Sequence, residues 1–383
     1  MRQLTLYDII KRRGGLFMQT IHKAKETMTA KERVLKTFAL EKTDRVTIGY
    51  ETNGGVHMRV AKALGIPDGN HEKVIQALGV DYRGVGAPYT GPSLFKELPD
   101  RRVDDIEGCY MRWIEHKTGG YWDFCDFPLK DADPEIIANY PVPDPDNFDY
   151  SRIAEQLERH KDKAIYTGGA GTPDIINSTG RIMGMEDVLV NLMLEDEATL
   201  HFLDRRVNMQ LSVMERTLAA AKGKIDFMWL GEDLGTQHSP MISLDLFRRV
   251  FRPRHQKFID LAKAYHIPVI IHTCGSSSWA YEDFIEMGMN GVDTLQPEAA
   301  NMSPKFLKEH FRGRLCFRGC VSTAGPLAYG NVEDTVKVVK DTLAIMMDGY
   351  GYHFAPTHAI QDNTPTENVI AMYNAAHEFG VYR

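Results

Sequence analysis

The feature that most constrains this chain is a repeated alternation of short apolar runs with longer amphipathic stretches, which continues to the C-terminus. Each run is bounded by glycine, polar or turn residues, as β-strands commonly are. The eight runs span residues 46–50, 82–85, 164–167, 227–230, 269–271, 292–295, 315–317 and 352–355. Strand and helix in regular alternation are typical of parallel βαβ units. Eight such strands predict an α/β fold of the (β/α)8 or TIM-barrel type, rather than a doubly wound sheet.

The 383 residues exceed the roughly 250 that such a barrel needs, so the sequence predicts segments outside it. Residues 1–28 mix apolar and basic side chains, and we expect an N-terminal helical arm there. The stretch from about 87 to 160 contains two alternating runs around a turn at 117–120, which predicts a β-hairpin excursion. We expect one domain over 29–383, which begins with a capping box at Thr29 and Glu32.

The charge balance limits the classes of partner. The chain has 52 acidic and 45 basic residues, a formal net charge of −7, which argues against nucleic acid or an anionic membrane as the main partner. No apolar run approaches the length of a membrane span, and the N-terminus lacks the apolar core of a secretory signal. Five cysteines, an odd number, do not form a disulfide framework. We therefore expect a cytoplasmic protein that acts on a small molecule.

Chemically capable side chains follow most of the predicted strands, at the end where the active sites of parallel barrels lie. They are Glu51 and Asn53 after the first run, Glu232, Asp233 and His238 after the fourth, His272 and Cys274 after the fifth, Gln296 after the sixth, Arg318 and Cys320 after the seventh, and His358 and Gln361 after the eighth. The candidates for substrate binding are Glu51, Asn53, Gln296, Arg318 and Gln361.

His272 and Cys274 form the most specific of these patterns. Residues i and i+2 on a strand point to the same face, so the imidazole and the thiol can converge on one ion. Nitrogen and sulfur ligands suit Zn²⁺, and a catalytic zinc keeps three protein ligands and one open position. The alternative is a buried histidine beside a small apolar cysteine. Spacing alone leaves the third ligand open, and the candidates are Cys320, Cys316, His358 and His238.

Glu232 and Asp233 are an adjacent acid pair directly after an apolar run. Neighbours on an extended chain point in opposite directions, so we expect only one of them to enter the site. Glu232 is favoured as a fourth ligand or as the acid–base group, with Asp233 supporting it; a solvated loop pair is the alternative. His238 is a further candidate for proton transfer or substrate binding, unless it only satisfies loop backbone groups.

Several motifs occur in a defined order. They are MTAKERV at 28–34, KTDRV at 42–46, GEDLG at 231–235, HTCG at 272–275, GMNGVD at 288–293, QPEA at 296–299, GC at 319–320 and APTH at 355–358 leading to TPTEN at 364–368. This ordered set resembles the uroporphyrinogen decarboxylase superfamily over nearly the whole chain after residue 28. The resemblance implies a (β/α)8 barrel with its active site in the barrel mouth.

The superfamily contains two chemistries. Its true decarboxylases act without metal on a tetrapyrrole that carries many carboxylates, and they hold it with an arginine-rich first loop. The matching loop here, residues 51–59, has a single arginine, so heme-pathway decarboxylation is disfavoured. The other branch consists of corrinoid-dependent methyltransferases, and the chain is more similar to it. In that branch the two residues that match His272 and Cys274 bind zinc, and a third ligand, usually cysteine, matches His358 here.

The resemblance thus implies a zinc-dependent methyltransferase that moves a methyl group between a small thiol, methoxy or methylamine substrate and a corrinoid on a partner protein. It also implies a possible homodimer. A first alternative is a metal-independent lyase on a smaller carboxylate, with Arg318 and Arg59 as clamps and Asp233 as proton donor. If Arg318 does not bind substrate, we expect it to form an ion pair with Glu298 or Asp293. A second alternative is a barrel that binds ligands without catalysis.

Overall fold

The computed structural model describes residues 18–116 and 119–383. The predicted N-terminal helical arm falls mostly outside this part of the chain. Its described portion, residues 18–28, forms neither helix nor strand. This segment lies along α16 (Thr366–Phe379), where the His22 N–H donates to Asn374 Oδ1 at 2.8 Å.

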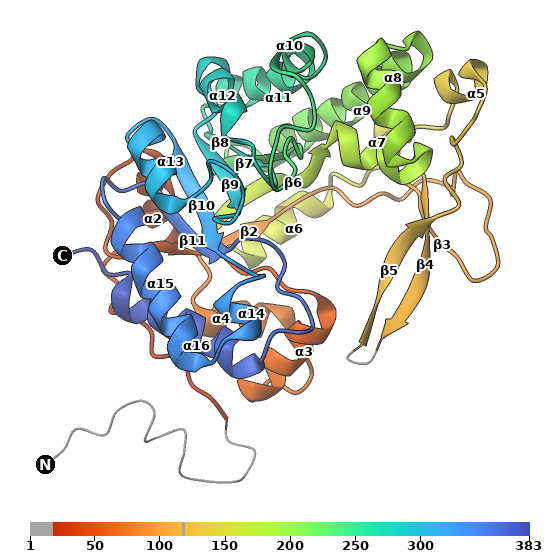
Figure 1. Cartoon of the computed structure of the whole chain (residues 1–383). Coiled ribbons are helices and arrows are strands. Elements are labelled where there is room, and N and C mark those ends of the chain that lie inside the picture. Colours follow the sequence, from red (N-terminus) through yellow and green to blue (C-terminus); the bar gives the residue numbers. More distant parts are fainter. Residues whose placement is uncertain (1–17, 117–118) are drawn as a thin grey trace, which may run out of the picture.

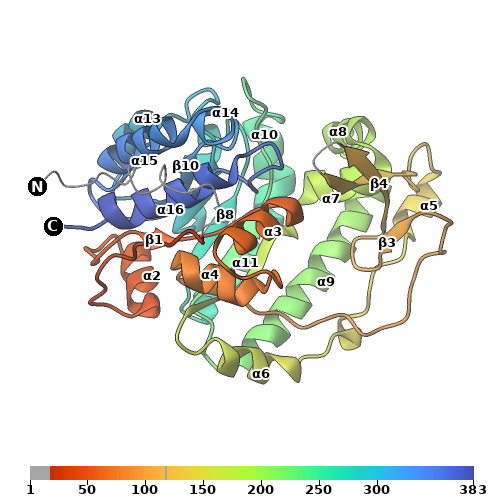
Figure 2. The same cartoon turned by 90° about the horizontal axis from the view of Figure 1, so that it is seen from below.

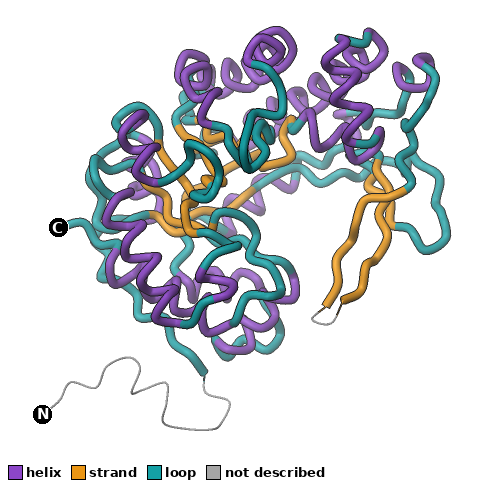
Figure 3. Tube along the Cα trace, in the orientation of Figure 1, coloured by secondary structure: helices purple, strands orange, loops and turns teal. Residues whose placement is uncertain are grey.

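Eight parallel strands form one curled, TIM-like sheet, in the order β1-β11-β10-β9-β8-β7-β6-β2. They are β1 (Thr47–Ile48), β2 (Tyr82–Gly84), β6 (Ala164–Pro173), β7 (Phe227–Gly231), β8 (Val269–His272), β9 (Gly291–Leu295), β10 (Cys316–Val321) and β11 (Tyr352–Pro356). The two strands at the ends of this order meet beside Asp81, whose N–H donates to Ile48 O at 3.0 Å and whose Oδ2 accepts from Ile48 N at 2.8 Å. The predicted α/β barrel and its eight strands are confirmed, and Figure 3 shows the strands inside a layer of helices.

The helices lie outside the sheet, as Figure 1 shows. They are α2 (Ala30–Phe38), α3 (Gly54–Ala63), α4 (His71–Leu78), α6 (Arg152–Arg159), α7 (Ile175–Met183), α8 (Met185–Leu194), α9 (Glu197–Ala221), α10 (Leu244–Leu246), α11 (Arg252–Ala264), α12 (Tyr281–Met287), α13 (Pro304–Phe311), α14 (Pro326–Tyr329), α15 (Val332–Met346) and α16. The predicted capping box opens α2, where Thr29 and Glu32 exchange side-chain to backbone hydrogen bonds. None of the helices in the described residues is long and apolar enough to cross a membrane.

The predicted excursion contains a small antiparallel sheet of β3 (Arg102–Asp104), β4 (Cys109–His116) and β5 (Gly119–Cys125). The hairpin prediction is confirmed, because β4 and β5 pair from Tyr110 with Cys125 up to His116 with Gly119. Figure 2 shows the long helix α9 between the barrel and this sheet. A short helix, α5 (Pro134–Ala138), packs on α9.

Two contacts fix the hairpin at opposite ends. Near its base, Arg181 of α7 pairs with Glu107 at 2.8 Å and lies over the ring of Phe124. At its closed end, His116 Nε2 lies 3.8 Å from Asp362, which belongs to the loop after β11. The hairpin therefore extends from α7 to the opposite side of the barrel mouth.

The barrel interior is filled largely by aromatic side chains. Tyr82, Phe227 and Trp229 belong to one buried cluster, against which Tyr166 packs. α2 contributes Phe38 to the same cluster and so covers one end of the barrel. This packing leaves the carboxyl ends of the strands as the open end, where the polar side chains gather.

Candidate metal centre

His272, Cys274 and His358 come together at the carboxyl ends of β8 and β11. One ligand atom from each lies within 4.8 Å of the other two, and His272 Nε2 is 3.4 Å from Cys274 Sγ. His272 is buried, Cys274 is half-buried and His358 is exposed, so the group has one open side. Two imidazoles and a thiol are a suitable donor set for zinc, and three protein ligands leave a position for substrate. The group fits a divalent metal.

The ring of His272 is oriented by groups on the neighbouring strand β9. Its Nδ1 lies 3.3 Å from Asp293 Oδ2 and 2.5 Å from Thr294 Oγ1, which leaves Nε2 directed at Cys274. Thr294 adopts φ +64°, a conformation that is rare for a β-branched residue. A carboxylate on the distal nitrogen of a histidine ligand fixes its tautomer and strengthens it as a donor.

The charge states of His272 and Cys274 are coupled. Burial alone lowers the pKa of His272, but its hydrogen bonds with Asp293 and Cys274 outweigh burial and hold that pKa well above its ordinary value. Burial raises the pKa of the Cys274 thiol to about 11, although His272 opposes the shift. Without metal the pair is therefore an imidazolium beside a thiol. A bound cation would displace a proton from each.

Asp233, rather than Glu232, faces the centre. Its Oδ1 accepts the Cys274 N–H at 2.7 Å and lies 3.8 Å from His272 Nε2, while its Oδ2 accepts from the Asn177 side chain at 2.9 Å. Asp233 thus holds the loop that carries Cys274. Gln296 supports the same loop, because its Oε1 accepts the Gly275 N–H at 2.6 Å.

Glu232, favoured from the sequence as a fourth ligand or acid–base group, is directed away from the centre and is fully buried. Its two carboxylate oxygens accept the N–H groups of Ile175 and Ile176 at 2.8 and 2.9 Å, and His255 Nε2 lies 3.4 Å away. Glu232 therefore caps α7, a role that corrects the expectation. The general expectation that only one of the two acids enters the site agrees with this geometry.

Two cavities meet at the candidate metal-binding group of His272, Cys274 and His358, called the metal-binding group below. The first, of about 360 Å³, lies in the barrel mouth and has aromatic walls that include Tyr50, Tyr82, Tyr166 and Trp229. The second, of about 780 Å³, is more polar and opens toward α7 and the hairpin; Asp174, Asn177, Arg181 and Asp233 line it. His272, His358 and Ala170 line both cavities. The group is therefore accessible from two directions.

The charge of Arg318 is already neutralised within the first cavity. Its guanidinium pairs with Asp293 Oδ1 at 2.5 Å and with Glu51. Its Nε–H donates to the Tyr82 hydroxyl oxygen at 2.7 Å, and it lies 4.5 Å from the centre of the Trp229 ring. The ion-pair alternative for Arg318 is thus what the structure shows, with Asp293 and Glu51 as partners. Arg83, the other arginine that lines this cavity, pairs with Glu72 at 2.9 Å, so neither guanidinium is free to bind an anion.

A family model for uroporphyrinogen decarboxylase (URO-D) matches residues 135–379, which is more than half of the chain. The chain belongs to the URO-D family. A solved methyltransferase from Methanosarcina mazei has a similar fold, with a TM-score of 0.65 and 17% sequence identity, over 92% of this chain and 99% of that one. No curated protein sequence matches this URO-D family member.

The remaining predicted site residues lie away from the metal-binding group. Asn53 caps α3, because its side chain accepts the Val56 N–H at 2.9 Å. His238 is exposed on the loop after β7, and the exposed Gln361 donates to Ala359 O. Cys320 is buried in β10 outside the group, and Cys316 is a core thiol that donates to Thr37 O. Of the five predicted substrate-binding residues, Glu51 and Arg318 line the first cavity.

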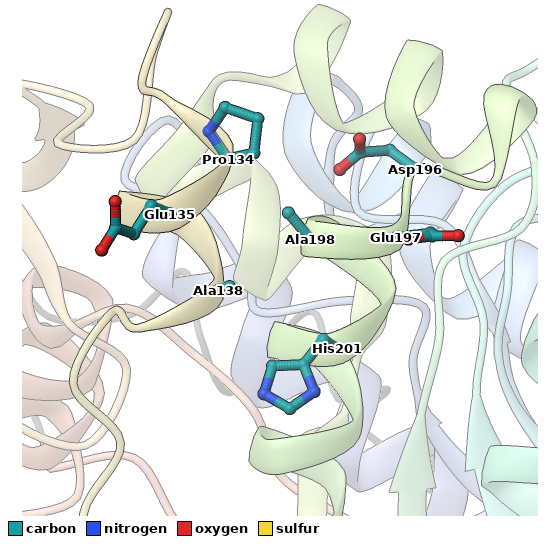
Figure 4. A pocket seen from close by; sticks show the side chains of 7 residues that line it. All are labelled: Pro134, Glu135, Ala138, Asp196, Glu197, Ala198 and His201. Carbon is teal, nitrogen blue, oxygen red and sulfur yellow. The ribbon is translucent and has the colours of Figure 1, made fainter.

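A separate surface hollow of about 590 Å³ lies between α5 and the start of α9 (Figure 4). Glu135, Asp196, Glu197 and His201 contribute its polar side chains, and it shares no lining residue with the other two cavities. Asp196 is committed to capping α9 through the Thr199 N–H. The hollow is formed by solvated helix ends, and nothing links it to the metal-binding group.

Sequence reasoning did not single out Asp174 or Thr294, and it treated Asp293 only as an ion-pair partner. Asp293 carried a usable signal, because an acid inside an otherwise apolar predicted strand is costly unless it is paired. Asp174 carried no such signal. The apolar run at 164–167 predicted the strand, but β6 continues to Pro173, so the sequence did not indicate that Asp174 lies at the end of the strand.

Proposed function

We propose that this URO-D family member is a zinc-dependent methyltransferase of a corrinoid one-carbon system. It moves a methyl group between a small methylated substrate and a corrinoid carried by a partner protein. The observation that carries the proposal is the group of His272, Cys274 and His358, with the distal nitrogen of His272 held by Asp293.

Zinc in such a site acts as a Lewis acid that polarises a methyl-bearing heteroatom or lowers the pKa of a thiol. His272 Nε2, Cys274 Sγ and His358 would hold it, and the open side would receive the substrate atom. Asp293 and Thr294 orient His272, while Asp233 and Gln296 fix the loop of Cys274.

The first cavity supports a small, uncharged or cationic substrate. Its volume of about 360 Å³ and its aromatic walls suit a compact molecule. Both of its arginines are already paired with acids, so neither is free to hold a carboxylate. The second cavity, more than twice as large, is the side from which we propose the corrinoid approaches. We further propose that the protein works in the cytoplasm, where cysteine ligands stay reduced.

The lyase alternative requires free cationic clamps for a carboxylate, and both proposed clamps are engaged. Arg318 pairs with Asp293 and Glu51, and Arg59 pairs with Asp362 at 3.2 Å. The pattern of ion pairs therefore favours methyl transfer over decarboxylation.

Metal analysis of the purified protein tests the proposal. We expect zinc at close to one ion per chain, lost in Cys274→Ser and retained in Cys125→Ser, a control thiol in the hairpin. Methyl transfer to cob(I)alamin, followed by its visible spectrum, is then measured with a methyl thioether, a methylamine and an aryl methyl ether. A metal-free protein that releases carbon dioxide from small acids would favour the lyase. A protein with neither activity, in which His272→Ala and His358→Ala leave ligand binding unchanged, would favour the non-catalytic barrel.

A further inference from the structure

Asp174 lies at the carboxyl end of β6 in an unusual backbone conformation. Its φ and ψ are +45° and +62°, the left-handed region that residues other than glycine rarely occupy. It precedes α7, yet its side chain makes no capping hydrogen bond. Glu232 accepts the N–H groups of Ile175 and Ile176 instead. The carboxyl of Asp174 therefore does not cap α7, although its position would predict that role. Residues other than glycine in this backbone conformation concentrate at functional sites.

The carboxyl group is buried and incompletely paired. Asp174 is 3% exposed, and its Oδ1 has no hydrogen-bond partner among the described residues. Its Oδ2 lies 3.7 Å from Arg181, whose Nη1 is committed to both oxygens of Glu107 at 2.9 and 2.8 Å. Buried polar atoms without a partner are uncommon because they cost free energy, and each one calls for a reason.

Asp174 lines the second cavity together with Asp233, His272 and His358. Asp233 uses one oxygen for the Cys274 N–H and the other for Asn177. Asp174, in contrast, keeps an oxygen free for a ligand. The fold thus presents an uncommitted carboxyl in the same cavity as two members of the metal-binding group.

Burial and the surrounding charges together bring the pKa of this carboxyl close to neutral pH. The charged and titratable groups that act on it or lie beside it are Arg181, Arg206, Glu107, Asp233, Glu232 and His272. Burial raises the pKa of Asp174 to about 7; Arg181 opposes this shift, and Asp233 and Glu107 add to it. A group with a pKa near the working pH can both donate and accept a proton.

We propose that Asp174 is the proton donor and acceptor for the substrate heteroatom that loses or gains the methyl group, when that atom lies at His272 and His358, where the substrate cavity meets the cavity that Asp174 lines. This proposal rests on the proposed methyl transfer. The bond between the heteroatom and the methyl carbon breaks, and the heteroatom keeps the bonding pair. The reduced corrinoid supplies the pair for the new bond to carbon. The protonated Asp174 gives its proton to the heteroatom and becomes a carboxylate, and in the reverse direction the carboxylate takes that proton back.

Infrared spectroscopy of the zinc-loaded protein tests the protonation state directly. We expect a carbonyl band from a protonated carboxylic acid that fades as the pH rises through about 7. The pKa of the buried Glu232 is also raised well above its ordinary value, so two variants assign the band: the component that titrates near pH 7 should be lost in Asp174→Asn and kept in Glu232→Gln. A band that is missing from the wild type, or unchanged in Asp174→Asn, overturns the proposal. This measurement needs no substrate. If Asp174→Asn fails to fold, Glu232→Gln decides it, because the component that titrates near pH 7 should persist there.

Kinetics test the role. With whichever of the three methyl donors reacts fastest, Asp174→Asn should lower kcat by about 10²-fold or more, with a smaller change in KM. It should also remove the inflection in kcat near pH 7. Zinc content and thermal unfolding confirm that the variant is folded. Unchanged kcat in a folded, zinc-containing variant refutes the role of Asp174, whereas a wild type that binds no zinc and transfers no methyl group refutes the proposed function instead.

Discussion

Asp293 joins Arg318 to His272: its Oδ1 lies 2.5 Å from the guanidinium of Arg318, and its Oδ2 lies 3.3 Å from His272 Nδ1. All three side chains are buried. One carboxylate therefore links the charge balance of the first cavity to the orientation of a metal-binding histidine.

Replacement of Asp293 by Asn should weaken zinc binding by about 10- to 100-fold, because His272 loses the carboxylate that orients it. Competition with a chromogenic chelator measures the change. Asp260→Asn, on the exposed face of α11, is the matched control and should leave the zinc affinity unchanged. Equal affinities in the two variants would contradict a role for Asp293 at the centre.

Replacement of Arg318 by Met should lower the free energy of unfolding by about 3–5 kcal/mol, because it leaves the fully buried Asp293 without its cation. Urea unfolding followed by circular dichroism measures the loss. The control is Arg312→Met, which breaks an exposed ion pair with Asp348 and should cost no more than about 1 kcal/mol.

Zinc affinity should increase from pH 6 to pH 8. Without metal, Cys274 is a thiol whose pKa is about 11, and the pKa of His272 is raised well above its ordinary value. Zinc must therefore displace protons from both, and acid competes with it. Calorimetry in buffers of different ionisation enthalpy should detect this proton release, and Cys274→Ser should reduce it. An affinity that is independent of pH would argue against Cys274 and His272 as ligands.

Glu232→Gln should affect stability rather than the metal site. The amide can still accept one of the two N–H groups of α7, but the second hydrogen bond is lost, at a cost of about 1–3 kcal/mol. Zinc binding should stay within a factor of about two of the wild type. Asp233→Asn gives the contrast, since it weakens the support of the Cys274 loop and should reduce zinc affinity more than unfolding stability.

The eight strands were predictable largely because six of them (β1, β7, β8, β9, β10 and β11) are buried along their whole length and read as mainly apolar runs. His272 and Cys274 were found for the same reason, since they directly follow such a run. Which of Glu232 and Asp233 faces the metal-binding group was not predictable, because it depends on the orientation of the chain at the end of β7. The helix cap made by Asn53 was a local signal, because the backbone N–H that it caps lies only three residues later, at Val56. His358 emerged from the resemblance, since its partners lie more than eighty residues away in the sequence.

The two cavities that meet at His272 and His358 have a consequence for the order of events. A donor in the aromatic cavity and an acceptor in the polar cavity can occupy the protein together, on either side of the transferred carbon. Under the proposed function, that arrangement would allow an in-line displacement, and neither molecule would have to leave before the other arrives. If the proposed methyl transfer holds, we expect its initial rates to follow a ternary-complex rather than a ping-pong rate law.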